Sequence, residues 1–124
     1  DRGRSGPVWA GVSGGRFVRV GPVSLGPAPP VDPAAARHRL QRELTAHAGV
    51  LRDAASLDAA LTTVTELLAA PRGDAVADHE LHNLATVGRA AVAAAARREE
   101  SRGAHTRDDF PDSRPEFAHR IVFA

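Results

Sequence analysis

Apolar residues recur at helical spacing from residue 33 onward, and the first such run predicts a helix over residues 33–48. Asp32 suits its start, because a carboxylate can accept hydrogen bonds from the unpaired N–H groups of a first helical turn. Pro33 fits the next position, where a missing N–H group costs nothing. Gly49 is expected to end the helix in a left-handed conformation. The apolar face of this helix consists of Ala36, Leu40, Leu44 and Ala48.

A second stripe predicts a helix over residues 57–70, with Ser56 as its N-cap. Pro71 and Gly73 are expected to end this helix, because neither residue type continues a helix well. A short loop then leads to the third helical segment. The second stripe consists of Leu57, Leu61, Val64 and Leu68.

The longest helix is predicted over residues 78–102, with Asp78 as its N-cap and Gly103 as its stop. Gly88 and the alanines of its apolar face would let a neighbouring helix approach closely. Acidic residues stand near the start of the segment and arginines near its end, as the helix dipole favours. The apolar face consists of Leu81, Leu84, Ala85, Gly88, Ala91, Val92, Ala95 and Ala96.

The segments on either side of the helices lack helical spacing. Residues 1–31 are rich in Gly and Pro and are expected to form a linker or irregular arm. A short strand or hairpin is possible there, formed from Phe17, Val18, Val20, Val23 and Leu25. Residues 104–124 are expected to form an extended tail, in which 121–123 is a strand candidate with no partner inside the helical part. The predicted fold is therefore all-α: a three-helix, spectrin-repeat-like bundle over residues 32–124, with this arm and this tail.

Composition narrows the classes of function. The chain has 124 residues, and its 16 basic residues, all arginine, nearly balance 15 acidic ones. Because the two signs alternate along the chain, the basic stripe of a nucleic-acid-binding protein is missing. With no cysteine, disulfides and thiolate metal sites are excluded. No run approaches the roughly 20 apolar residues of a membrane span, so a cytoplasmic protein is expected.

Three candidate sites fail on spacing or on missing partners. The segment His79-Glu80-Leu81-His82 separates its histidines by three positions, whereas the zinc-protease pattern separates them by four. Gly11 to Gly15 lacks the G-x-G-x-x-G spacing of a dinucleotide-binding loop. His105 could act as a general base oriented by Asp108 or Asp109, but no nucleophile or pocket accompanies it. We therefore assign no catalytic, cofactor-binding or metal-binding residue to this chain.

The densest polar segment is more specific than any of these candidates. It reads Arg98-Glu99-Glu100-Ser101-Arg102-Gly103-Ala104-His105, followed by Arg107, Asp109, Phe110 and Pro111. This string resembles the R-x-E-S-R-G-A-H-x-R-x-D-[FY]-P signature of flavoproteins in the succinate dehydrogenase, fumarate reductase and L-aspartate oxidase superfamily. Leu40 to Arg52 resembles the L-Q-x-x-M-x-x-x-x-G-[IV]-x-R segment of the same superfamily, with Leu44 in place of Met. The resemblance covers about residues 39–123.

Within the superfamily, the chain is most similar to the L-aspartate oxidase branch. The loop over residues 70–78 is short, whereas dehydrogenase subunits tend to carry an insertion there. The run Glu80-Leu81-His82-Asn83-Leu84-Ala85-Thr86-Val87 resembles the E-L-x-N-L-x-T-V run of aspartate oxidases. The run Phe117-Ala118-His119-Arg120-Ile121-Val122 fits their ending. The alternatives are the corresponding domain of a succinate dehydrogenase or fumarate reductase flavoprotein subunit, and an autonomous helical interaction module.

The resemblance implies an enzyme that oxidises L-aspartate to iminoaspartate on FAD and passes electrons to oxygen or fumarate, in the route to quinolinate and NAD. In that superfamily the flavin-binding and substrate-binding residues lie in other domains, and none of their motifs occurs in this chain. The resemblance therefore implies a non-catalytic C-terminal domain whose partner is the flavin-binding domain of its own polypeptide. Alone, such a domain would expose apolar surface and could self-associate. The domain-docking candidates are Arg98, Glu100, Ser101, Arg102, His105 and Arg107.

Overall fold

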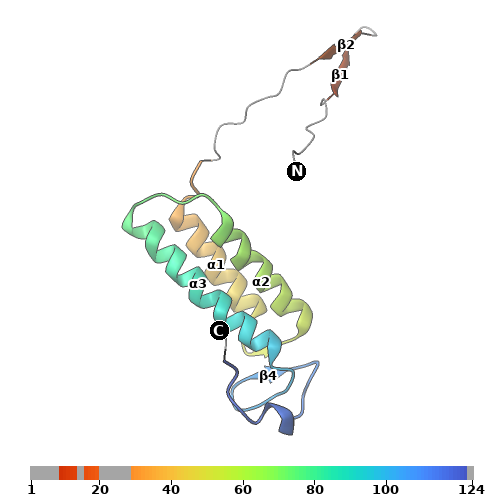
Figure 1. The fold of residues 1–124 in the computed structure, drawn as a ribbon, viewed down its shortest axis with the longest axis vertical. Coiled ribbons are helices and arrows are strands. Elements are labelled where there is room, and N and C mark those ends of the chain that lie inside the picture. The colour runs from red at the N-terminus through yellow and green to blue at the C-terminus, as the bar shows by residue number, and fades with distance from the viewer. Residues whose placement is uncertain (1–8, 14–15, 20–28, 123–124) are drawn as a thin grey trace.

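The computed structural model describes residues 9–13, 16–19 and 29–122, and within the last range three helices lie side by side (Figure 1). They are α1 (Pro33–His47), α2 (Ala54–Ala69) and α3 (Val76–Arg97). Because the connections are short, consecutive helices run in opposite directions, and each of the three contacts both others. The expected all-α, three-helix bundle is confirmed.

The arm contains an antiparallel hairpin. Strand β1 (Trp9–Ser13) pairs with β2 (Arg16–Arg19), with an irregularity in register between Trp9 and Val12. Phe17 and Val18 lie in β2 as expected, whereas the other members of the predicted hairpin, Val20, Val23 and Leu25, lie outside the described residues. The role of residues 1–31 as a linker stays a prediction.

Each helix begins next to an aspartate, but two of the predicted N-caps are wrong. Asp32 caps α1 as expected, accepting from the backbone N–H groups of Ala34 and Ala35 at 3.4 and 3.1 Å. The cap of α2 is Asp53 and not Ser56, which stands at the third helical position and completes a reciprocal capping box with Asp53. In such a box both polar residues make capping hydrogen bonds, so the sequence did not show which of the two is the N-cap.

The start of α3 repeats this error. The helix begins at Val76, and the predicted cap Asp78 is already its third residue. From there the Asp78 carboxylate accepts from the backbone N–H of Ala75 at 3.0 Å. The carboxylate therefore still satisfies a terminal N–H group, but from inside the helix.

The two glycines predicted as helix stops act differently from expectation. Gly49 follows α1 without a positive φ, and a Cβ there would lie 2.7 Å from the carbonyl oxygen of Thr45. A glycine fits position 49 because its backbone lies close to the Thr45 carbonyl, and not because the residue takes a left-handed conformation. The helix α3 ends at Arg97 instead of residue 102, and Gly103 (φ 59°) lies in a later turn. The early end reflects side-chain hydrogen bonds from Arg107, described below.

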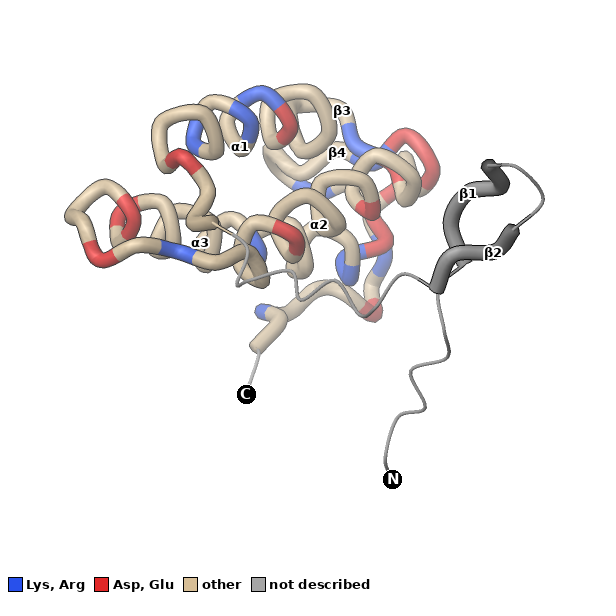
Figure 2. The backbone as a smooth tube through the Cα atoms, turned by 90° about the horizontal axis from the view of Figure 1, so that it is seen from above, with Lys and Arg blue, Asp and Glu red and all other residues tan. Residues whose placement is uncertain are grey.

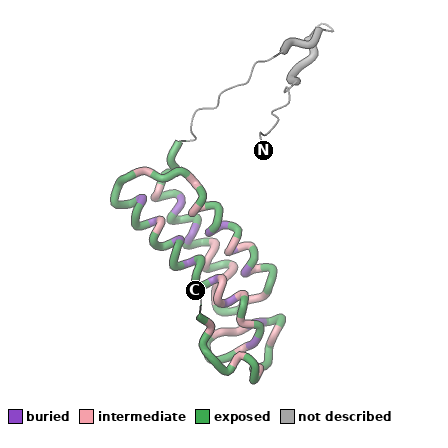
Figure 3. Tube along the Cα trace, viewed as in Figure 1, coloured by how far each residue is buried: buried purple, intermediate pink, exposed green. Residues whose placement is uncertain are grey.

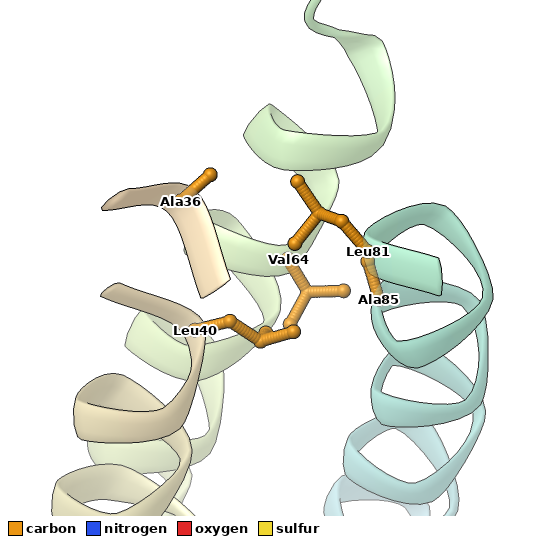
Figure 4. Close-up of a cluster of buried hydrophobic side chains, with 5 residues drawn as sticks. All are labelled: Ala36, Leu40, Val64, Leu81 and Ala85. Atoms are coloured by element: carbon orange, nitrogen blue, oxygen red, sulfur yellow. The ribbon is translucent and has the colours of Figure 1, made fainter. Parts of the chain in front are cut away.

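The core comprises two clusters of Ala, Val and Leu side chains, and the buried positions lie along the facing sides of the helices (Figure 3). Leu44 is partly buried and packs against both clusters. Leu84 and Ala91, which were predicted to face the core, lie outside it, and Leu84 is 41% exposed. The first cluster, shown in Figure 4, consists of Ala36, Leu40, Val64, Leu81 and Ala85. The second cluster consists of Leu57, Ala60, Val92 and Ala95.

The tail returns to the bundle, but not through the strand that was predicted. Strand β4 (Thr106–Arg107) runs parallel to β3 (Leu51–Arg52), which joins α1 to α2, and a 3-10 helix follows at Pro115–Phe117. Ile121 and Val122 form no strand, and Val122 is 84% exposed; Phe123 lies outside the described residues. Among the helices described, none is long and apolar enough to cross a membrane.

Candidate functional site: the C-terminal cap

Residues 98–120, here called the cap, fold against the end of the bundle where α3 finishes and α2 begins (Figure 1). At the centre of the cap lies Glu100, whose side chain is 0% exposed. One carboxylate oxygen accepts from Arg98 Nη1 at 2.6 Å and from Arg102 Nε at 2.8 Å. The other accepts from Arg102 Nη2 at 3.0 Å and from the Arg114 backbone N–H at 2.7 Å. Glu100 thus organises the first half of the cap.

These contacts decide the protonation state of Glu100. Burial alone raises the pKa of a carboxyl group, because it disfavours the charged form. Here the hydrogen bond from Arg102 is the largest influence, and with the bonds from Arg114 and Arg98 it lowers the pKa of Glu100 from 4.5 to about 2. Glu100 is therefore a carboxylate at neutral pH, paired on both oxygens.

A second ion pair joins opposite ends of two helices. Arg107 is 2% exposed, and its guanidinium donates to both Asp109 oxygens, from Nε at 2.7 Å and Nη2 at 2.6 Å. Its Nη1 donates to the carbonyl oxygens of Ala95 and Ala96, at the C-terminus of α3. Asp109 in turn accepts from the backbone N–H of Ala54, at the N-terminus of α2, at 2.9 Å. The cation thus stands at a negative helix end and the carboxylate at a positive one, which suits both dipoles.

The Arg107–Asp109 contact shifts both groups toward their charged forms. The hydrogen bond from Arg107 is the largest of the influences that lower the pKa of Asp109 from 3.8 to about 2. The reciprocal bond raises the pKa of Arg107. At neutral pH the pair is fully charged and closes the bundle end.

Ser101 and a tight turn connect the two ion-paired centres. The Ser101 hydroxyl accepts from the Arg107 backbone N–H at 2.8 Å and lies 2.9 Å from the Phe110 carbonyl oxygen, to which it can donate. Arg102 and His105 exchange backbone hydrogen bonds, and Gly103 takes a positive φ between them. Glycine at this first central position is what a two-residue type II′ turn requires.

His105 is held by one donor and one acceptor. Its Nδ1 lies 2.9 Å from Arg52 Nη1, and its Nε2 lies 3.0 Å from the Arg98 carbonyl oxygen. Because a guanidinium only donates and a carbonyl only accepts, Nδ1 accepts and the proton resides on Nε2. His105 thus connects β3 with the end of α3, with both ring nitrogens engaged.

The structure brings all six docking candidates together in the cap, but some of them contact their own chain and others are exposed at its surface. Glu100 and Arg107 are buried inside this chain, and Ser101 bonds to its own loop, so these three organise the cap. Arg102 is 44% exposed at its side chain, and Arg98 and His105 are partly exposed. The exposed side of Arg102 and the partly exposed Arg98 and His105 offer charged or polar surface to another protein.

Three residues that organise the cap were not among the docking candidates. Asp109 completes the ion pair of Arg107, Arg52 positions His105, and the backbone N–H of Arg114 binds Glu100. The motif strings contained Asp109 and Arg52, so their spacing was a usable signal. The role of Arg114 depends on its backbone, which no side-chain pattern reveals.

The helix starts in the described part of the chain do not fit a dinucleotide cofactor. A pyrophosphate group is usually bound at a helix N-terminus, where free N–H groups and the dipole attract it. Here the start of each helix is next to a carboxylate of its own chain: Asp32, Asp53 and Asp78 respectively. These charges would repel a phosphate. Within residues 9–13, 16–19 and 29–122, no group of three His, Asp or Glu side chains is arranged to hold a metal ion.

Comparison with known proteins gives consistent results. The family described as "Fumarate reductase flavoprotein C-term" matches residues 37–122. A protein from Rhodospirillum rubrum named L-aspartate oxidase is 40% identical over 102 residues, which cover 82% of this chain and 35% of that protein. An L-aspartate oxidase from Streptomyces coelicolor is 43% identical over 97 residues, covering 69% of this chain and 17% of that protein. The chain thus spans about a third or less of these relatives. No solved structure matches.

Proposed function

This chain belongs to the fumarate reductase flavoprotein C-terminal family, and on that premise we propose that it is the non-catalytic C-terminal domain of an L-aspartate oxidase. The match over residues 37–122 covers the bundle except the first turn of α1, and all of the cap. The relatives from Rhodospirillum rubrum and Streptomyces coelicolor favour the oxidase branch, because both bear that name.

The hydrogen bonds within the cap are the observation that supports a non-catalytic role. His105, the best candidate for a general base, has both ring nitrogens in hydrogen bonds. The carboxylates of Glu100 and Asp109 each bind arginine and a backbone N–H group. A group whose lone pairs are already engaged is a poor proton acceptor, so the polar side chains of the cap stabilise structure instead of performing chemistry.

The proposed parent enzyme would hold FAD in another domain, where the cofactor would supply the redox chemistry that converts L-aspartate to iminoaspartate for quinolinate and NAD synthesis. Electrons then pass to oxygen or fumarate, and the enzyme acts in the cytoplasm. The present domain contributes a surface that packs against the flavin-binding domain. The part of the cap available for that contact includes the exposed side of Arg102 and the partly exposed Arg98 and His105.

The first experiment compares the isolated chain with the complete polypeptide. Each is mixed with FAD and L-aspartate, and flavin absorbance and peroxide release are followed. We expect flavin retention and peroxide only from the complete polypeptide. Turnover by the isolated chain would contradict the non-catalytic role. Oxidation of succinate in place of L-aspartate by the complete polypeptide would move the chain to the dehydrogenase branch.

Docking is tested by an Arg102→Ala, His105→Ala double variant of the complete polypeptide. We expect faster flavin loss, because weaker contact with the cap leaves the flavin domain less stable. The matched control is Arg89→Ala, which changes an exposed arginine on α3 away from the cap. Flavin retention equal to that of the control would contradict docking through the cap.

A further inference from the structure

An open hollow of about 500 Å³ lies on the outer side of the cap. Its residues come from the end of α3, the tight turn, the last residue of the 3-10 helix and the tail that follows it. Five of the seven carry arginine or histidine side chains, and no carboxylate is among them. The lining consists of Arg98, Arg102, His105, Phe117, Ala118, His119 and Arg120.

The walls of the hollow are held in place before any partner binds. Arg98 donates to the carbonyl oxygens of Phe117 and His119, both at 2.7 Å, and so fastens the tail against the end of α3. The Arg102 guanidinium is oriented by two bonds to the buried Glu100. The His105 ring is fixed at both nitrogens. A preformed site loses less conformational entropy when it binds a ligand.

The charge around the hollow is unbalanced. Glu100 compensates one of the three lining arginines, which leaves two positive charges at the surface. Its bonds occupy Nε and Nη2 of Arg102, and within the part of the chain that the structure describes no acceptor contacts Nη1. Elsewhere basic and acidic residues are interspersed along the helices (Figure 2). The hollow is therefore a local cationic site on a nearly neutral chain.

We propose that this hollow receives an aspartate or glutamate side chain from the flavin-binding domain of the same polypeptide, next to an apolar residue that packs on Phe117. The inference rests on the proposed function and names the chemistry of the docking partner. Guanidinium groups bind a carboxylate through charge-assisted hydrogen bonds, and a ring and a methyl group, from Phe117 and Ala118, supply apolar surface beside them. Nucleic acid is a poorer fit, because no basic stripe extends beyond the hollow.

The absence of lysine from the chain allows a direct test. Carbodiimide joins a lysine amine to a carboxylate in contact with it, and the 124 residues contain no lysine. An Arg120→Lys substitution keeps the charge at the hollow and introduces the one lysine amine of the domain. In the complete polypeptide, mass spectrometry after coupling should find residue 120 linked to an aspartate or glutamate of the flavin-binding domain. Arg89→Lys, at an exposed position on α3, is the matched control and should give no such link.

A charge reversal gives a second, independent measurement. Arg120→Glu should lower the Tm of the complete polypeptide and leave the Tm of the isolated 124-residue chain unchanged, since the Arg120 side chain is exposed and forms no hydrogen bond or salt bridge with the described residues. Arg89→Glu should change neither. Coupling of residue 120 only to this chain's own carboxylates, or equal effects of the two reversals, would overturn the proposal. Oxidase activity tests the proposed function separately, because neither of these readouts depends on turnover.

Discussion

At the scale of single residues, the burial of an arginine determines how much it contributes to the stability of this fold. The Arg37–Glu80 pair joins α1 to α3 at 3.2 Å, but both side chains are about half exposed. Such a surface pair contributes about 0–1 kcal/mol. Arg107, by contrast, is buried, neutralises Asp109 and satisfies two helix-terminal carbonyl groups. Its loss would leave the buried Ala95 carbonyl and the partly buried Ala96 carbonyl and Asp109 carboxylate without this donor.

We therefore expect Arg107→Met to destabilise the chain by about 3 kcal/mol, the lower end of the range for breaking a buried ion pair. Methionine keeps much of the side-chain volume, so the change reports the lost hydrogen bonds and charge. The free energy of unfolding is measured by urea denaturation. Arg89→Met is the control and should stay within about 0.5 kcal/mol. Similar values for the two variants would mean that Arg107 does not hold the cap.

The pKa values of Glu100 and Asp109 predict acid sensitivity. Both are lowered in the folded chain, from 4.5 and 3.8 respectively to about 2, by hydrogen bonds from arginine. Between these limits the unfolded chain binds more protons than the folded one, so stability rises with pH there. The stabilisation is complete above pH 4.5 and is lost progressively as the pH falls through about 2.

This pH dependence is measured by urea denaturation from pH 7 to pH 2. The loss of stability should begin below about pH 4.5 and should be smaller in Glu100→Gln and Asp109→Asn, which lack the respective titrating group. If both variants lost as much free energy of unfolding below pH 4.5 as the unaltered chain, other carboxyl groups would be the cause of the acid sensitivity.

At the scale of elements, small residues set the distance between the helices. A Cβ on Gly88 would lie 3.3 Å from Leu44 Cδ1, on α1, and 4.0 Å from Val64 Cγ2, on α2. Gly88 thus stands where α3 faces both other helices. A glycine inside a helix costs about 0.5–1 kcal/mol relative to alanine. The close approach of Leu44 explains why a glycine fits here.

A Gly88→Leu substitution should destabilise the bundle by about 2 kcal/mol, because the added side chain must displace Leu44 or separate the helices. Thermal and urea unfolding both measure the effect. Ala90→Leu places the same side chain at an exposed position of α3 and should change stability by no more than about 0.5 kcal/mol. Equal tolerance at both positions would contradict the close packing at Gly88.

At the scale of the whole molecule, a small core is divided into two clusters that share Leu44. The second cluster lies toward the cap, and its largest fully buried apolar side chain is Leu57. Most of its other members are alanine, so little apolar area compensates for a lost leucine. The cap extends this end of the core through ion pairs and hydrogen bonds instead of through apolar packing.

Leu57→Ala should therefore cost about 3 kcal/mol, a large share of the roughly 5–15 kcal/mol that stabilises a typical small domain. Leu84→Ala removes the same atoms from an exposed position of α3 and serves as the control. Urea denaturation of both variants gives the comparison. Comparable losses in the two variants would mean that Leu57 does not anchor the core.

The sequence alone determined the fold class, the order of the three helices and the dense polar segment that carries the family motif. Periodic apolar residues such as Leu40, Val64 and Leu81 are sufficient for this, because helical spacing depends only on local geometry and one face must be buried. Asp32-Pro33 likewise defined the start of α1, since capping acts within one turn. The motif through Arg107 identified the family before any geometry was known.

Only the tertiary structure decided where α3 ends and what the polar residues of the cap contact. Arg107 binds the carbonyl groups of Ala95 and Ala96, which lie twelve and eleven residues away along the chain, and Asp109 accepts from Ala54, 55 residues away. Gly103 was predicted from the neighbouring sequence to end α3, but it lies in a turn beyond Arg97, where the helix ends. Such contacts depend on the packing of distant segments, so local propensity assigned residues 98–102 to the third helix and could not identify their partners.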